Sequence, residues 1–139
     1  MSMVIVNIES PLSADTEEGR KANVEYARRC LLHSLQHGEA PFAMHLLYPQ
    51  VLDDKKPEER EAGIRAGCEI IKVVDVEAVY FDRGISRGMK QGMSRALKSL
   101  KPIEFRSLEG KRHPTDKELH EGEVPHYHDG CTLCAKRLG

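Results

Sequence analysis

Short apolar runs alternate with long stretches of helical periodicity along most of this chain. The pattern predicts strands at 3–8, 77–81 and 103–106, and a further strand candidate at 40–47 that Pro41 interrupts. Helices are expected at 17–36, from 57 to about 73, and from about 86 to 100. Strands that are separated by helices imply right-handed βαβ units. We therefore expect an α/β domain, with a small open parallel sheet and helices on both of its faces.

Composition limits the partners and the compartment. The chain has 139 residues, of which 40% are hydrophobic and 31% charged, and this size suits one core. No apolar run approaches the ~20 residues that span a bilayer, and no signal-peptide pattern opens the chain, so we expect a cytoplasmic protein without membrane contact. The formal charge of -1 gives no overall attraction for a nucleic-acid backbone. A small molecule is the expected partner, and nucleic acid is disfavoured.

The loops that follow the predicted strands are the expected ligand site, because ligands of open parallel sheets bind beyond the carboxyl ends of the strands. Ser10, His45 and Asp82 lie in these loops. The turn 82–89 leads into a helix, whose free N–H groups favour a phosphate or a carboxylate. Ser86 can equally be the N-cap of this helix, and Gly88 can serve close packing.

The ordered pattern over 3–108 resembles the nucleoside 2-deoxyribosyltransferase-like proteins, which include small phage and bacterial members and the related nucleotide N-glycosidases. The resemblance rests on six segments in this order: 10–12, 23–28, the stretch 40–50, 57–60, Asp75 and the turn 86–89. The resemblance implies a Rossmann-like fold of the deoxyribosyltransferase type, a nucleoside or nucleotide ligand, and a homo-oligomer. The substrate-binding positions that it implies are Ser10, Pro11, His45, Tyr48, Ser86, Gly88 and Met89. His45 could instead be a buried structural histidine, and Tyr48 a loop anchor.

One position departs from that family. Its enzymes use a glutamate six residues after the serine of the helix start as the nucleophile, and this position is Gly92 here. A carboxylate from elsewhere could assist glycosyl transfer. The candidates are Asp53, Asp54, Glu58 and Asp82, each of which could also be a solvated or capping residue. Two hypotheses follow: an N-glycosidase or nucleoside deoxyribosyltransferase, or a catalytically silent protein that binds or sequesters nucleotides.

The segment 109–139 is polar, and we interpret it as a tail that does not extend the core. Near its end a Cys-x-x-Cys follows a His-x-His, which suits a structural zinc ion. The candidate ligands are His126, His128, Cys131 and Cys134. Alternatives are a disordered tail with free thiols, or a zinc-knuckle interaction module supported by the α/β body. No cofactor is expected for residues 1–108.

Overall fold

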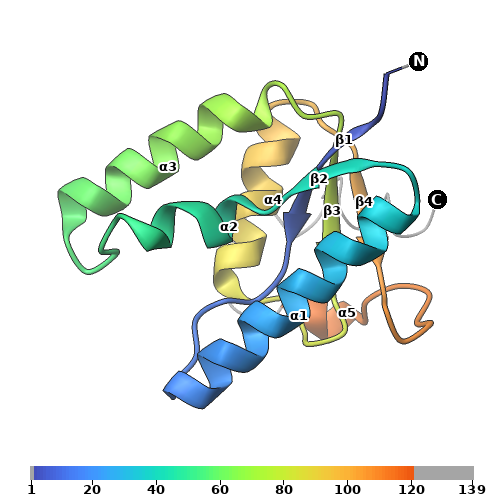
Figure 1. The fold of residues 1–139 in the computed structure, drawn as a ribbon, viewed down its shortest axis with the longest axis horizontal. Helices are drawn as coiled ribbons and strands as arrows, with labels where there is room; N and C mark the ends of the chain where they lie inside the picture. The colour runs from blue at the N-terminus through green and yellow to red at the C-terminus, as the bar shows by residue number, and fades with distance from the viewer. Residues whose placement is uncertain (1, 121–139) are drawn as a thin grey trace.

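A four-stranded parallel sheet forms the centre of the molecule, as the sequence pattern predicts. The computed structural model describes residues 2–120 (Figure 1). The strands are β1 (Ile5–Glu9), β2 (Ala40–Phe42), β3 (Val76–Tyr80) and β4 (Ile103–Arg106). Their order is β2-β1-β3-β4, and every neighbouring pair is parallel.

Helices connect the strands, and the sequence explains where several of them begin. They are α1 (Glu17–Gln36), α2 (Met44–Leu47), the 3-10 turn η1 (Tyr48–Gln50), α3 (Pro57–Ile71), α4 (Arg87–Lys98) and α5 (Asp116–His120). The Thr16 hydroxyl caps α1 by accepting a hydrogen bond from the Gly19 N–H at 3.0 Å. Pro57 opens α3, where its missing N–H costs nothing. No helix within 2–120 has the length and apolar character needed to cross a membrane.

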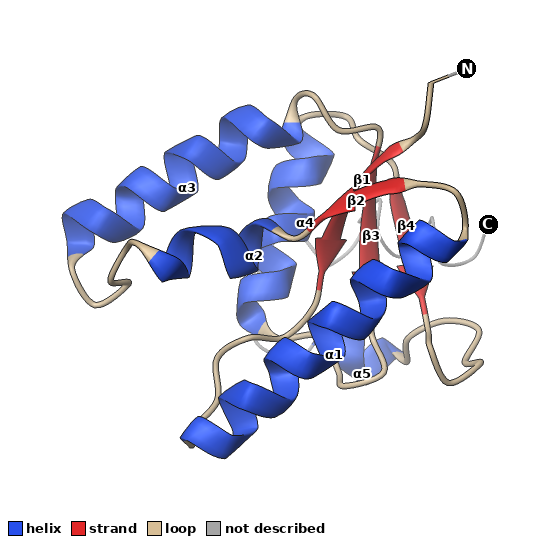
Figure 2. Cartoon of the chain, in the orientation of Figure 1, coloured by secondary structure: helices blue, strands red, loops and turns tan. Residues whose placement is uncertain are grey.

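The helices cover both faces of the sheet (Figure 2), as expected. On one face, α1 packs Tyr26 and Cys30 against Val6, Ile8 and other strand residues. The opposite face carries a second core, in which α3 and α4 meet the alternate strand residues. Successive side chains of a strand point to opposite faces, so each strand serves both cores.

The methionines of α4 belong to this second core. Met89 and Met93 are 1% and 0% exposed. Their spacing along the helix therefore reflects packing on the sheet.

The structure corrects two expectations. The strand expected at 40–47 ends at Phe42, and the chain then turns into α2, with the Leu46 N–H bonded to the Ala43 carbonyl at 3.1 Å. β2 is an edge strand, where Pro41 is tolerated, but its missing N–H does not favour a long strand. The polar segment after residue 108 also contributes to the core, because Leu119 of α5 is 2% exposed and packs in the second core.

Candidate functional site

The sheet has its topological switch point between β1 and β3. From β1 the chain passes through α1 to β2 on one side, and from β2 it crosses to β3 on the other side. The connections leaving β1 and β3 therefore diverge at the carboxyl ends of these two strands. Open α/β sheets bind their ligands in the crevice at such a point.

Two buried carboxyl groups lie at this point, on the face covered by α4. Asn7 and Glu77 are register partners in the β1–β3 pair, and Glu9 is the last residue of β1. Glu9 is 7% exposed and Glu77 is fully buried. The Asn7 side-chain amide donates a hydrogen bond to Glu77 Oε1. The Glu9 and Glu77 carboxyl groups contact each other within hydrogen-bonding range.

Burial keeps at least one proton on this pair. Burial is the main cause that raises the pKa of both carboxyl groups, and the neighbouring charge of Glu77 raises the pKa of Glu9 further. Arg95 on α4 acts in the opposite direction and only partly offsets the effect. Two carboxyl groups in contact inside a protein resist ionising together, so the raised pKa values favour at least one proton on the pair near neutral pH.

Gly92 of α4 makes room for Glu9. A Cβ atom at position 92 would lie 2.2 Å from Glu9 Oε2 and 2.6 Å from Glu9 Cδ, which is far inside van der Waals contact. The Glu9 carboxyl group therefore occupies the space that any side chain at position 92 would need. The resemblance implies a glutamate nucleophile at this position, whereas here the space beside Gly92 is filled by a carboxyl group from β1.

Two of the predicted substrate-binding residues, Ser10 and His45, contact each other. Ser10 directly follows Glu9 in the sequence. The Ser10 Oγ and the His45 Nε2 are 2.8 Å apart, and Ser10 is 3% exposed. Burial lowers the pKa of His45 to about 4, and the neighbouring Ile8 backbone opposes this only in part. His45 is therefore neutral at pH 7 and can accept or donate a hydrogen bond. Pro11 is buried beside Ser10, whereas Tyr48 is half-buried in η1.

The start of α4 has the capping geometry that was weighed against an anion site. The Ser86 hydroxyl accepts a hydrogen bond from the Met89 N–H at 3.2 Å and so caps the helix. The Met89 side chain is in the core, while Ser86 and Gly88 are exposed. Of the three predicted contact residues at this helix start, Ser86 and Gly88 are therefore open to a ligand and the Met89 side chain is not.

The four loop carboxylates proposed as catalytic candidates lie in two separate places. Asp53, Asp54 and Glu58 are exposed around the start of α3. Asp53 closes a local turn by accepting a hydrogen bond from the Lys55 N–H at 3.0 Å.

Asp82 has a structural environment. Its carboxylate accepts hydrogen bonds from the Tyr26 hydroxyl at 2.6 Å, the Leu108 N–H at 2.8 Å and the Ser107 hydroxyl. Burial opposes its ionisation, but the hydrogen bonds from Ser107 and Tyr26 outweigh burial and lower the pKa. Asp82 therefore ties the end of β3 to α1 and to the loop after β4.

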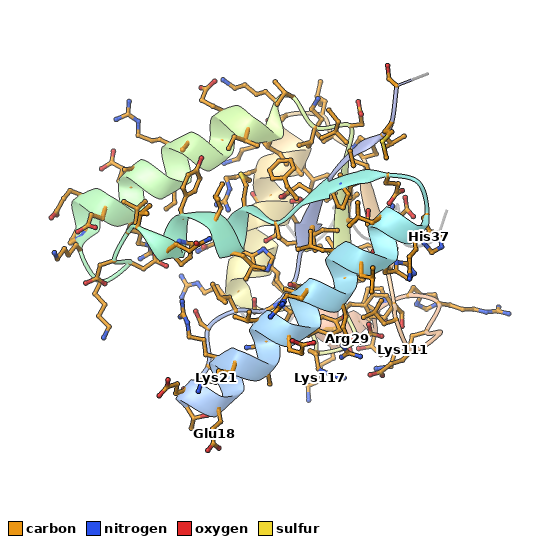
Figure 3. The ribbon with its side chains drawn as sticks, viewed as in Figure 1. Glu18, Lys21, Arg29, His37, Lys111 and Lys117 are labelled. Carbon is orange, nitrogen blue, oxygen red and sulfur yellow. The ribbon has the colours of Figure 1, made fainter. Side chains whose placement is uncertain are left out.

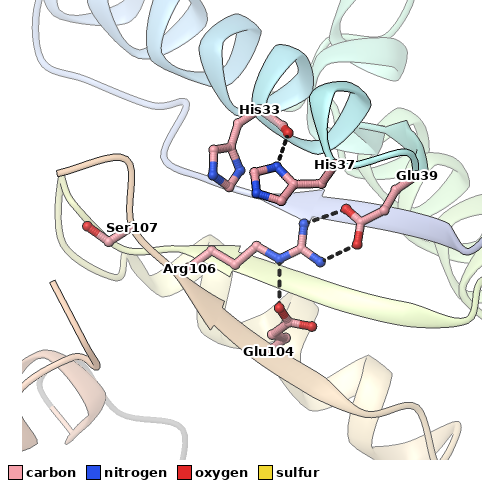
Figure 4. Close-up of a pocket in the computed structure, with 6 residues that line it drawn as sticks. All are labelled: His33, His37, Glu39, Glu104, Arg106 and Ser107. Atoms are coloured by element: carbon pink, nitrogen blue, oxygen red, sulfur yellow. Dashed lines mark hydrogen bonds and ion pairs between the residues drawn. The ribbon is translucent and has the colours of Figure 1, made fainter. Parts of the chain in front are cut away.

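A cavity of about 260 Å³ lies on the α1 side of the sheet, on the face opposite to Glu9 (Figure 4). Its lining residues are His33, His37, Glu39, Glu104, Arg106 and Ser107. Glu39 binds the Arg106 guanidinium through two hydrogen bonds of 2.7 and 2.8 Å. The Arg106 guanidinium in this cavity is thus already paired with the Glu39 carboxylate.

A shallower hollow of about 460 Å³ follows the exposed side of α1. Its lining is mostly charged and consists of Glu17, Arg20, Lys21, Val24, Glu25 and Arg28. Figure 3 labels Lys21 among them. Charged side chains on an exposed helix face are ordinarily solvated, and neither hollow contains the residues expected to bind substrate.

Metal ligands are absent from the part of the chain that the structure describes. Within 2–120 no group of three or more His, Cys, Asp or Glu side chains could hold a metal ion. The predicted zinc ligands His126, His128, Cys131 and Cys134 lie outside the described residues, so the zinc site stays a prediction.

Comparisons with known proteins identify the family of this chain and a solved structure with a similar fold. The family described as "Domain of unknown function (DUF7768)" matches residues 4–106. The chain belongs to the DUF7768 family. The match spans the whole sheet of the DUF7768 domain and ends with β4. No curated protein matches the chain.

Among solved structures, the 2-deoxyribosyltransferase of Bacillus psychrosaccharolyticus is similar to this DUF7768 domain in fold. The TM-score is 0.54 at 17% sequence identity, with 78% of this chain and 75% of that chain covered. This similarity confirms the expected deoxyribosyltransferase type of α/β fold and indicates a distant structural relationship.

The sequence analysis missed the residues that the fold brings together at the switch point. Glu9 follows the strand expected at 3–8, and Glu77 is the first residue of the strand expected at 77–81. Neither residue was predicted to have a functional role. A usable indication was present, because central parallel strands are buried on both faces and rarely carry acids. An acid in each of two such strands points to a site.

Proposed function

We propose that this DUF7768 protein binds a nucleoside or nucleotide at the carboxyl ends of β1 and β3 and acts on its N-glycosidic bond. The observation that carries the proposal is the buried Glu9–Glu77 carboxyl pair at the switch point of a deoxyribosyltransferase-like fold. Cleavage of a glycosidic bond needs carboxyl groups beside the anomeric carbon, in protonation states that burial can set.

Polar groups that follow β1 and β2 at the carboxyl edge of the sheet suit a polar ligand. A neutral His45, hydrogen bonded to Ser10, can exchange this bond for one to a base or a sugar hydroxyl. At the exposed start of α4, free N–H groups favour a 5'-phosphate if the ligand is a nucleotide. We propose Ser10, His45, Ser86 and Gly88 as the ligand-contacting residues.

A catalytically silent binding protein is the second candidate. It is favoured by Gly92, since the position where the resembled family carries its nucleophile has no side chain here. Binding without base release would establish this candidate, and binding with base release would exclude it.

The experiment is a panel of nucleosides and 5'-nucleotides incubated with the purified full chain. Binding is measured by the shift in melting temperature, and free base is measured by chromatography in the same samples. We expect a shift with at least one ligand that decreases strongly in Ser10→Ala and stays in Ser99→Ala, a matched change at the far end of α4. A panel in which no ligand shifts the melting temperature would contradict the proposal.

The resemblance also implies an oligomer, and we propose a homo-oligomer in solution. Light scattering of the full chain tests this separately, because a monomer that still binds nucleosides would remove the oligomer and leave the binding proposal intact.

A further inference from the structure

The carboxyl pair leaves two buried oxygens without a hydrogen-bond partner among the described residues. They are Glu77 Oε2 and Asn7 Oδ1, on side chains that are 0% and 2% exposed. Buried polar atoms without partners are costly, so each needs an explanation. A proton on the Glu9 carboxyl group supplies the donor that Glu77 Oε2 lacks. Asn7 Oδ1 then remains beside the pair as an acceptor with no donor among the described residues.

The two acids are not equivalent in position. Glu9 is the last residue of β1 and so lies at the carboxyl edge, where ligands of this fold class bind. Glu77 is the second residue of β3, one step deeper, and the Asn7 amide holds it in place. Gly92 gives the Glu9 carboxyl group its space. Glu9 therefore lies nearer the ligand-binding edge of the sheet than Glu77, which lies behind it.

The charges that act on Glu9 come from two elements. β3 contributes Glu77, which favours the protonated form, and α4 contributes Arg95, which opposes it. His45 on α2 is uncharged at neutral pH. Burial and Glu77 together therefore favour the protonated form of Glu9 at the end of β1.

We infer that Glu9 is the general acid that protonates the departing nucleobase, with Glu77 as the positioning residue that keeps the proton on Glu9. This inference rests on the proposed function and names the acid of that site. It differs from a nucleophilic role, because no glycosyl ester is formed on the protein.

The step balances as a hydrolysis. The bond between the anomeric carbon and the base nitrogen breaks, its electron pair stays on the nitrogen, and Glu9 gives its proton to the base. A water oxygen bonds to the anomeric carbon, and the proton that this water releases returns to the Glu9–Glu77 pair. The products are the free base and the sugar, and the pair ends with one proton, as it began.

The test compares isosteric variants in the base-release assay. Glu9→Gln should reduce base release by about 100-fold or more, the usual size of a general-acid contribution, while the ligand-induced thermal shift is retained. Glu77→Gln should keep part of the activity and move the alkaline limb of the pH–rate profile to lower pH, because Glu9 loses the negative neighbour that holds its proton. Glu61→Gln on the exposed side of α3 is the control and should match the parent.

The outcomes separate this inference from the proposed function. If Glu9→Gln releases base at the parent rate, Glu9 is not the acid. A parent that binds ligands but releases no base overturns the inference and leaves binding intact. A parent without any binding overturns the proposed function itself.

A measurement without substrate gives an independent test. Carbon-13 NMR titration of the glutamate side-chain carboxyl carbons, assigned with the two Gln variants, reports the protonation of the pair directly. We expect one proton on the pair at pH 7 in the free protein. Two fully ionised carboxylates at pH 7 would overturn the inference whatever the activity.

Discussion

At the level of single residues, Gly92 has the least room for a side chain of the glycines that the structure describes, because Glu9 packs against it. Gly92→Ala would place a Cβ atom 2.2 Å from Glu9 Oε2. We expect a loss of about 1–3 kcal/mol in the free energy of unfolding, which is typical of overpacking. In a Glu9→Ala background the same change should be neutral or stabilising by up to about 1 kcal/mol, because alanine is the better helix former.

A double-mutant cycle in urea measures this coupling. The four proteins are the parent, Gly92→Ala, Glu9→Ala and the double variant. Equal effects of Gly92→Ala in both backgrounds would show that the two residues do not compete for space.

The protonation of the pair should also appear in the pH dependence of stability. A carboxyl group whose pKa is raised by folding binds its proton more tightly in the folded state, so its contribution to stability falls as the pH rises from about 4.3 to the raised pKa. Glu77 has such a raised pKa because it is buried. We therefore expect Glu77→Gln to gain stability relative to the parent as the pH rises across this window, and then to level off.

Urea midpoints of the parent and Glu77→Gln between pH 4.5 and 8 measure this difference. The lowered pKa of His45 gives an opposite trend, but it is present in both proteins and cancels. Glu61→Gln should show a constant difference, and a constant difference in Glu77→Gln would contradict the prediction.

The residues of this pair could not be recognised from the sequence alone. Glu9 and Glu77 are 68 positions apart, and only the β1–β3 register brings them together. By contrast, Ser10 and His45 were predicted at one site and do meet, because both follow predicted strands closely. Local sequence patterns thus predict which residues lie in the loops after the strands. The Glu9–Glu77 pair depends on strand order, which these patterns do not give.

At the level of elements, the main helices and strands were predictable because their patterns are local. α1, α3 and α4 follow clear apolar periods with capping residues or proline at their starts, and β1, β3 and β4 are short apolar runs. The expected second strand was too long because its apolar residues fit α2 equally well. Short apolar runs do not distinguish a strand from a helix by period alone.

The Asp82 carboxylate holds several elements together, and this gives a further prediction. It joins Tyr26 of α1 to Ser107 and Leu108 after β4. Asp82→Asn should cost about 1.5–3 kcal/mol, since hydrogen bonds to a charged acceptor are lost. Hydrogen exchange of the Leu108 amide should become faster.

Tyr26→Phe is the matched partial variant, because it removes one of these hydrogen bonds and keeps the carboxylate. Its cost should be about 1 kcal/mol, with less effect on the Leu108 amide. If Asp82→Asn unfolds at the same urea concentration as the parent, Asp82 is not a structural tie.

At the level of the whole molecule, the core extends beyond the segment that matches the DUF7768 family. The match ends at residue 106, but Leu119 is 2% exposed among the residues of the second core. Leu119→Ala should destabilise the protein by about 2–5 kcal/mol, as for a buried leucine. The control is Leu35→Ala on α1, which is 56% exposed and should change stability little.

Chemical denaturation of both variants checks this prediction. A small effect of Leu119→Ala would mean that α5 does not support the core, and that truncation after residue 108 leaves a stable domain. The sequence could not indicate this contact, because one leucine in a polar segment carries no periodicity.

The space shared by positions 9 and 92 has a consequence for the history of this family. One volume holds either a carboxyl group from the first strand or a side chain from the fourth helix, so the two positions must change together. Among relatives of this chain we expect the two positions to covary. A bulky or acidic residue at position 92 should occur only with a short residue at position 9. During evolution the acid could then move between position 9 and position 92 in two ways only. Either an ancestor had no acid at either position, or both positions changed in one paired substitution.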